Sequence, residues 1–275
     1  MNWKILNVSI PVKNIKKSIK FYEMLLGKSV CTDDVMKNIF ENDEDYFFGK
    51  KGFGLRLFKP KQDLCLERKL QSRRSFVTIL VDGLEKIKES LNANQISFLY
   101  NEFNGLKKIQ VQEPSLNLIQ FVENNNQFNT DYDGFDFGLD WGIHHMNLES
   151  LDVRESVNFF SNIVGFNEGK WKAPKNKGDF SIDPKELSIF PTSKDNKGLH
   201  IIKPDDGFGY RNNFAHNPSI AGHPAFTIKN LSELIKKLQK RKILFSDAKV
   251  YAMPGFHQIY LYDNNANMLE INQSV

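Results

Sequence analysis

Apolar and polar residues alternate at the start of the chain and then change to a helical spacing. Residues 4–12 (KILNVSIPV) alternate as a half-buried strand does, and residues 14–26 (NIKKSIKFYEMLL) carry apolar residues on one helical face. Asn14 suits a helix N-cap, and Gly27 suits the residue that ends the helix. The pattern therefore predicts a strand followed by a helix.

The same order of elements recurs along the chain. Residues 142–165 repeat the first strand and helix, so that Ser18 aligns with Ser156, and residues 75–98 match residues 222–245 in the same way. Each predicted helix is followed by short β-rich runs, among them 53–59 (FGLRLFK), 106–112 (LKKIQVQ), 199–203 (LHIIK) and 257–263 (HQIYLYD). We predict four units of strand, helix and three strands, over 3–60, 74–125, 141–203 and 220–275.

The four units pair into two similar halves, which predicts an α+β fold. The polar stretch 123–138 (ENNNQFNTDYDGFDFG) is the expected connection between them. We place an N-terminal domain at 1–130 and a C-terminal domain at 139–275. The stretch 203–222 is a long loop, and such loops in folded domains often carry function.

Composition narrows the class of protein. The 275 residues carry a net charge of +4 without a dense run of Lys or Arg, so we expect no nucleic-acid partner. Cys31 and Cys65 form no C-x-x-C pair, which favours a reducing, cytoplasmic location. We expect no signal peptide and no membrane span, because no apolar stretch is long enough. A small-molecule partner is expected, and the sequence leaves homo-oligomerisation open.

Two segments carry a resemblance to a known family. Residues 7–27 (NVSIPVKNIKKSIKFYEMLLG) and residues 261–272 (LYDNNANMLEIN) resemble the opening strand–helix and the closing turn–strand of the vicinal oxygen chelate superfamily, which includes glyoxalases, bleomycin-resistance proteins and extradiol dioxygenases. Four βαβββ modules in two halves resemble the type I extradiol dioxygenases best. The resemblance implies that each half is a curved mixed sheet around a barrel-like cavity, with flanking helices.

The resemblance also implies that metal ligands lie on the first and last strands of the modules. With the four predicted helices in register, the C-terminal half presents His145, His223 and Glu270 at these positions. The N-terminal half presents instead the set Asn7, Phe76 and Gln120. Two imidazoles and a carboxylate can hold a divalent ion on one face and leave the other face open to a substrate. His144 is the adjacent alternative, but strand alternation predicts that it points to the opposite face.

Further candidates surround this predicted site. In extradiol dioxygenases a histidine on the strand that holds His200 acts as an acid–base catalyst, and a tyrosine at the position of Tyr260 orients the substrate. The long loop supplies Tyr210, Arg211 and His216 as candidates for substrate binding. His257 is another, although strand alternation directs it away from Tyr260.

The resemblance implies a non-haem Fe(II) enzyme that cleaves a catechol-type ring. Two features depart from that pattern: a histidine expected shortly before Tyr260 is replaced by Tyr-Ala-Met at 251–253, and the final turn has Asn264 and Ala266 instead of proline and glycine. Two alternatives therefore stay open. One is a glyoxalase-like isomerase, lyase or transferase that uses Mn(II), Zn(II), Ni(II) or Mg(II), and the other is a non-catalytic binding or resistance protein.

Overall fold

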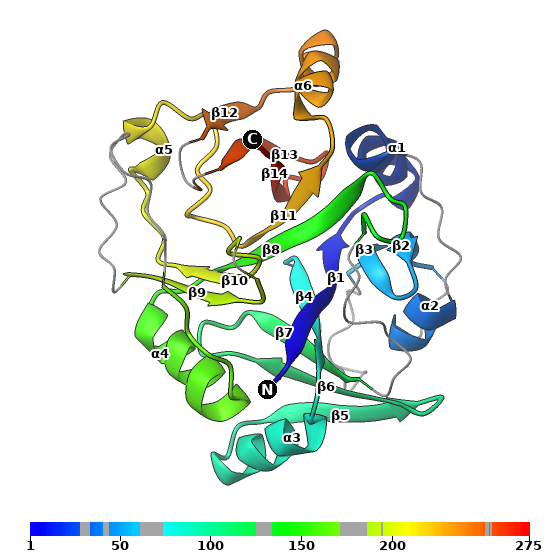
Figure 1. Cartoon of the computed structure of the whole chain (residues 1–275), viewed down its shortest axis with the longest axis vertical. Coiled ribbons are helices and arrows are strands. Elements are labelled where there is room, and N and C mark those ends of the chain that lie inside the picture. The colour runs from blue at the N-terminus through cyan, green and yellow to red at the C-terminus, as the bar shows by residue number, and fades with distance from the viewer. Residues whose placement is uncertain are drawn as a thin grey trace.

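Two seven-stranded mixed sheets, one in each half of the chain, form the framework of the protein (Figure 1). The computed structural model describes residues 1–27, 34–40, 44–60, 74–124, 134–170, 186–193, 195–250, 253 and 255–275. Cys31, Cys65, residues 125–133 of the expected connection and residues 251–252 lie outside the described residues.

The first half contains β1 (Trp3–Pro11), α1 (Ile15–Leu26), α2 (Asp34–Phe40), β2 (Tyr46–Lys50), β3 (Phe53–Phe58), β4 (Phe76–Val81), α3 (Leu84–Ala93), β5 (Phe98–Phe103), β6 (Leu106–Gln112) and β7 (Leu118–Glu123). The second contains β8 (Trp141–Glu149), α4 (Val153–Asn158), the π-helical turn η1 (Phe159–Val164), β9 (Leu187–Pro191), β10 (Gly198–Ile202), α5 (Phe208–Arg211), β11 (His223–Ile228), α6 (Leu231–Lys240), β12 (Ser246–Lys249), β13 (Phe256–Tyr262) and β14 (Met268–Ser274).

The two sheets have equivalent strand orders, β2-β3-β1-β4-β7-β6-β5 and β9-β10-β8-β11-β14-β13-β12. In each, the opening strands of the two modules pair antiparallel at the centre, and each also pairs parallel with the last strand of its own module. This arrangement confirms the predicted α+β fold of two similar halves. In the described residues the first and third modules have two strands after the helix instead of the predicted three.

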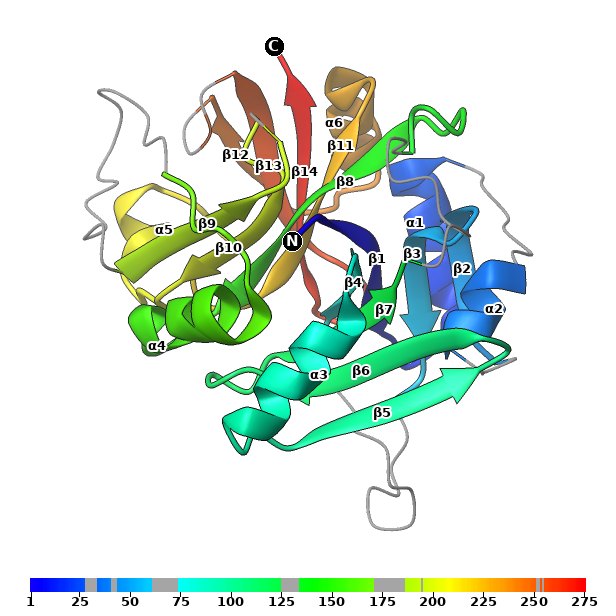
Figure 2. The same ribbon diagram turned by 60° about the horizontal axis from the view of Figure 1, so that its bottom comes forward.

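Local sequence signals explain where the helices begin. The side chain of Asn14 accepts a hydrogen bond from the backbone N–H of Lys17, as predicted for an N-cap, and Gly27 ends the helix with a φ of 84°. Asp152 and Asn230 cap α4 and α6 in the same way. The helices lie on the outside of the molecule, and β1 and β8 meet where the two halves join (Figures 1 and 2).

A shared hydrophobic core holds the halves together. One cluster of buried residues includes strands of both sheets, and its aromatic pairs cross the boundary: Trp3 stacks on Phe166 with ring centroids 4.3 Å apart, and Phe53 contacts Trp141. No helix in the described ranges is long and apolar enough to cross a membrane.

A buried carboxylate in each half also accepts a hydrogen bond from a helix of the other half. The turn after β13 holds Asp263, which accepts a hydrogen bond from the Tyr22 hydroxyl of α1 at 2.9 Å. The equivalent turn after β6 holds Glu113, which accepts a hydrogen bond from the Ser156 hydroxyl of α4 at 2.6 Å. Both carboxylates are almost fully buried. The strand that carries Glu270 is therefore anchored to the N-terminal half.

Candidate metal centre

Three central strands of the second sheet bring His145, His223 and Glu270 together. His145 lies on β8, His223 on β11 and Glu270 on β14, and Ala225 pairs with both His145 and Glu270. One ligand atom from each residue lies within 4.8 Å of the others, and all three side chains are buried. His145 Nε2 is 3.5 Å from Glu270 Oε2, and His223 Nε2 is 3.9 Å from the same oxygen. The predicted trio therefore converges on one point.

A β-bulge corrects the prediction for His144. Ala225 pairs with His145 but Phe226 pairs with Ile143, so His144 is the extra residue on β8. Strand alternation fails at such a bulge, and His144 Nδ1 lies 2.9 Å from His145 Nδ1 instead of on the opposite face. The same irregularity occurs at the equivalent place in β1, between Ile5 and Asn7.

Neighbouring polar groups hold the three side chains in orientations that suit metal binding. His223 Nδ1 is 2.9 Å from the carbonyl oxygen of Ala221, which leaves Nε2 for a metal. Burial, together with the nearby His145, lowers the pKa of His144 from 6.5 to about 3, so His144 is neutral. Its Nδ1 can therefore accept a hydrogen bond from His145 Nδ1. Asn272 Nδ2 donates to Glu270 Oε1 at 2.9 Å. Both imidazoles thus direct Nε2 toward Glu270 Oε2.

The charge state of Glu270 also suits a cation. Burial alone would raise its pKa, but His145 and then His223 outweigh that effect and hold the pKa well below its usual value. The carboxylate is therefore ionised although it is almost fully buried. A buried anion beside two imidazoles is the donor set expected for a divalent transition metal.

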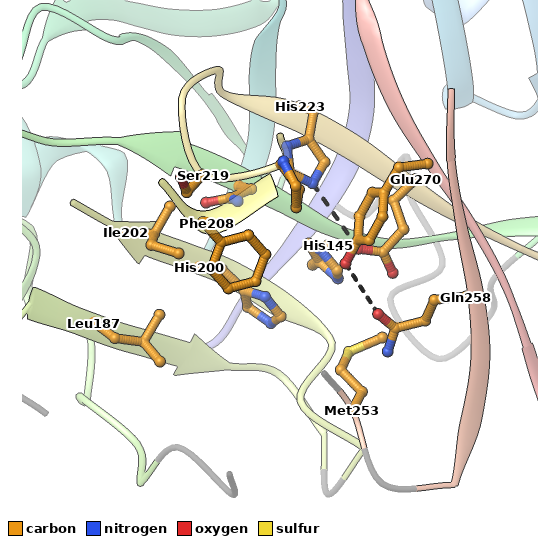
Figure 3. Close-up of a pocket in the computed structure, with 13 residues that line it drawn as sticks. His145, Leu187, His200, Ile202, Phe208, Ser219, His223, Met253, Gln258 and Glu270 are labelled. Carbon is orange, nitrogen blue, oxygen red and sulfur yellow. Dashed lines mark hydrogen bonds and ion pairs between the residues drawn. The ribbon is translucent and has the colours of Figure 1, made fainter. Parts of the chain in front are cut away.

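A cavity of about 470 Å³, including its open mouth, extends from the trio. Figure 3 shows His145, His223 and Glu270 converging, with Gln258 and Met253 on one side of the cavity and Leu187 and Ile202 on the other. The wall thus joins the polar trio to an apolar surface that can hold a ring.

Two predicted catalytic residues lie in this cavity. The His200 ring stacks on His145 with centroids 3.8 Å apart, and its Nε2 is 2.8 Å from the carbonyl oxygen of Asn196. Burial, and next the neighbouring His145, lower the pKa of His200 well below its usual value, so the ring is neutral. Tyr260 pairs with Glu270 across the strands, and burial followed by the charge of Glu270 raises its pKa well above 10.0. Its hydroxyl therefore stays protonated.

The structure does not bring the four predicted substrate-binding residues into the cavity. Tyr210 is 91% exposed on α5, and Arg211 pairs with Asp205. His216 points its Nδ1 at the hydroxyl of Ser246, and His257 pairs with Asp247 at 2.7 Å. These partners direct the side chains away from the trio, and His257 faces away from Tyr260 as strand alternation predicts.

The long loop does line the cavity, but through residues that sequence reasoning missed: Phe208, Pro218 and Ser219. Asn147 and Gln258 were missed as well, although both follow from alternation. Asn147 is two residues after His145 on β8, and Gln258 is two residues before Tyr260 on β13, so each shares a face with a recognised candidate.

The N-terminal half has the same register but no ligand set among its described residues. Asn7 and Gln120 stand at the positions of His145 and Glu270, and Arg56 stands at that of His200. Helix α2 covers this face, with Met36 Sδ 3.7 Å from Asn7 Nδ2. Phe40 of the same helix packs against Arg56. This half is filled by its own side chains.

Comparison with known proteins supports the fold but not the reaction. No protein-family model matches the sequence, and no curated protein is similar enough in sequence to match. The 2,3-dioxygenase LapB from Pseudomonas sp. KL28 has a similar structure, with a TM-score of 0.62 and 12% identity over 98% of this chain and 90% of that one.

Two further solved structures are similar to the same degree. The Mn(II)-bound glyoxalase from Novosphingobium aromaticivorans has a TM-score of 0.60 and 12% identity, covering 98% of this chain and 81% of its own. Homoprotocatechuate 2,3-dioxygenase from Arthrobacter globiformis has a TM-score of 0.58 and 12% identity, covering 98% and 78%. The chain therefore shares the two-half fold of these dioxygenase and glyoxalase structures.

Proposed function

We propose that this protein is a metal-dependent enzyme whose ion is held by His145, His223 and Glu270. The observation that carries the proposal is the convergence of these three buried side chains at one end of a cavity. The donor set fits a divalent ion, because each imidazole has its other nitrogen engaged and the carboxylate is ionised. Ligands on one face leave the cavity side of such an ion open to a substrate.

We further propose Fe(II) as the ion and a catechol-type compound as the substrate. His145, His223 and Glu270 would hold the iron, which would supply Lewis acidity toward the two hydroxyl oxygens and electrons for the activation of dioxygen. The two-histidine, one-carboxylate donor set suits Fe(II), and the four modules and the dioxygenase neighbours are the grounds for an oxygen-dependent reaction.

His200 and Tyr260 supply the groups that act on the substrate. Because His200 Nε2 bonds to a backbone carbonyl, its proton sits on Nε2 and a lone pair sits on Nδ1. A neutral imidazole of this kind can take a proton from a substrate hydroxyl at Nδ1 and return it later. Tyr260, which stays protonated, orients an oxygen of the substrate near Glu270.

The test is oxygen uptake by protein loaded with Fe(II) under nitrogen and then given a panel of catechols. The proposal expects oxygen consumption in proportion to catechol, with a new absorbance from the ring-opened product. His200→Ala should keep the metal and lose turnover by a factor of about 10² to 10⁴. Full turnover in this variant would refute the role of His200, and no oxygen uptake with any catechol would refute the dioxygenase reaction.

A second candidate is an oxygen-independent reaction of the glyoxalase type. The Mn(II)-bound glyoxalase is as similar in structure as the dioxygenases are, so the fold does not separate the two reactions. Turnover without oxygen by the protein loaded with Mn(II), Zn(II), Ni(II) or Mg(II) would favour this candidate. Tight ligand binding without turnover under either condition would favour a binding or resistance protein.

A further inference from the structure

Gln258 places in the cavity an amide N–H donor that no described residue satisfies. The side chain is fully buried and lines the cavity beside Tyr260. Its Oε1 accepts a hydrogen bond from the Tyr260 hydroxyl at 3.0 Å. Its Nε2 is buried and has no hydrogen-bond partner among the residues that the structure describes. Figure 3 shows this amide between Met253 and the Glu270 side of the cavity.

An unpaired buried donor is costly unless a ligand completes it. Leaving one buried amide N–H without a partner costs about 1 to 3 kcal/mol. Asn147, on β8, contributes an unpaired buried acceptor, because its Oδ1 has no hydrogen-bond partner within the described part of the chain. Two orphaned amide atoms in one cavity indicate a ligand with polar groups beyond those that reach the metal.

The position of Gln258 on β13 indicates where in the cavity the substrate atom that accepts its hydrogen bond would lie. Tyr260 is the cross-strand partner of Glu270, and Gln258 is two residues before Tyr260 on β13, on the same face. Positions two residues apart on a strand are separated by about 7 Å. The long Gln258 side chain spans that separation, because its Oε1 is 3.0 Å from the Tyr260 hydroxyl, so Nε2 of the same amide lies next to the substrate oxygen that Tyr260 would orient.

We propose that Gln258 determines substrate specificity by donating a hydrogen bond from Nε2 to a third oxygen of the substrate. The substrate class is a vicinal diol or diphenol that carries an acceptor oxygen, such as an ether or carbonyl, on the atom next to the chelating pair. Through Oε1 the same side chain holds the Tyr260 hydroxyl, so the two groups bind the substrate as a unit. This inference rests on the proposed catechol-type function.

Two catechols of nearly equal size separate the acceptor from the shape. In 3-methoxycatechol an ether oxygen stands beside the hydroxyls, and in 3-ethylcatechol a methylene stands at the same place. Binding to the Fe(II)-loaded protein is measured under nitrogen by calorimetry, so no turnover is needed. We expect the wild-type protein to bind 3-methoxycatechol about threefold to tenfold more tightly, as one net hydrogen bond predicts.

The variant Gln258→Met keeps the length of the side chain and removes the donor. It should bind both catechols with equal affinity, while Gln110→Met, the same change in the N-terminal half, should keep the wild-type preference. Thermal unfolding of each variant confirms that it folds. If Gln258→Met still binds 3-methoxycatechol more tightly than 3-ethylcatechol, the proposal is overturned. Equal binding of the two catechols by the wild-type protein would also overturn it, whatever the variants do. Failure to bind either catechol at all would refute the proposed substrate class as well.

Discussion

Replacing Asn272 with leucine should weaken metal binding without touching a ligand. Asn272 is fully buried on β14, donates to Glu270 Oε1 at 2.9 Å and accepts from the Thr227 hydroxyl at 2.7 Å. A hydrogen bond to a charged group contributes about 1.5 to 3 kcal/mol. In the metal-free protein Glu270 can rotate or take up a proton to relieve the loss, but a metal-bound carboxylate cannot. Most of the cost should therefore fall on the metal complex.

We expect a metal affinity about 10- to 100-fold lower in Asn272→Leu, which is the usual effect of removing a residue that orients a ligand. Such a factor corresponds to about 1.4 to 2.8 kcal/mol, in agreement with the hydrogen-bond figure. The assay is competition against a chromophoric chelator under nitrogen. Gln120→Leu, at the position of Glu270 in the N-terminal half, is the control and should leave the affinity unchanged. An Asn272→Leu affinity within about twofold of wild type would refute this reasoning.

Three further predictions test the surrounding structure. Tyr22→Phe should lower the free energy of unfolding by about 1 to 3 kcal/mol in chemical denaturation, because Asp263 loses a buried donor. Burial, and then Asp263, raise the pKa of Tyr22 well above 10.0. The wild-type protein should therefore lose stability as the pH rises above about 10, and Tyr22→Phe should lack the part of this loss that Tyr22 causes. Identical stability profiles of the two proteins at alkaline pH would contradict this prediction. Met36→Ala should lower the free energy of unfolding by about 2 to 5 kcal/mol and leave the metal content unchanged, because Met36 is buried against the N-terminal sheet. A loss of metal in this variant would contradict the placement of the metal site in the C-terminal half.

Much of the framework could be predicted from the sequence because its signals are local and repeated. Asn14 and Gly27 mark the ends of α1 by cap chemistry, and the repetition of strand and helix placed His145 and His223 at equivalent positions. Glu270 followed from the same register on the last strand. The pairing of the strands reproduces this register in both halves.

The features that the sequence did not reveal depend on tertiary structure. The bulge at His144 interrupts the two-residue period on which the prediction of its direction rested. The length of the 203–222 loop predicts that it carries function, but which of its side chains enter the cavity depends on the path of the loop. Phe208 and Ser219 turn inward, whereas the partner of Arg211 is Asp205 within the loop. The filling of the N-terminal half by α2 is likewise a matter of packing.

The metal content of protein purified under nitrogen tests the central claim most directly. We predict about one divalent ion per wild-type chain, as a single site of two histidines and one carboxylate requires. His145→Ala and His223→Ala should both lose the ion, while Asn7→Ala, at the position of His145 in the N-terminal half, should keep it. Full metal occupancy in either histidine variant would contradict the assignment of the ligands.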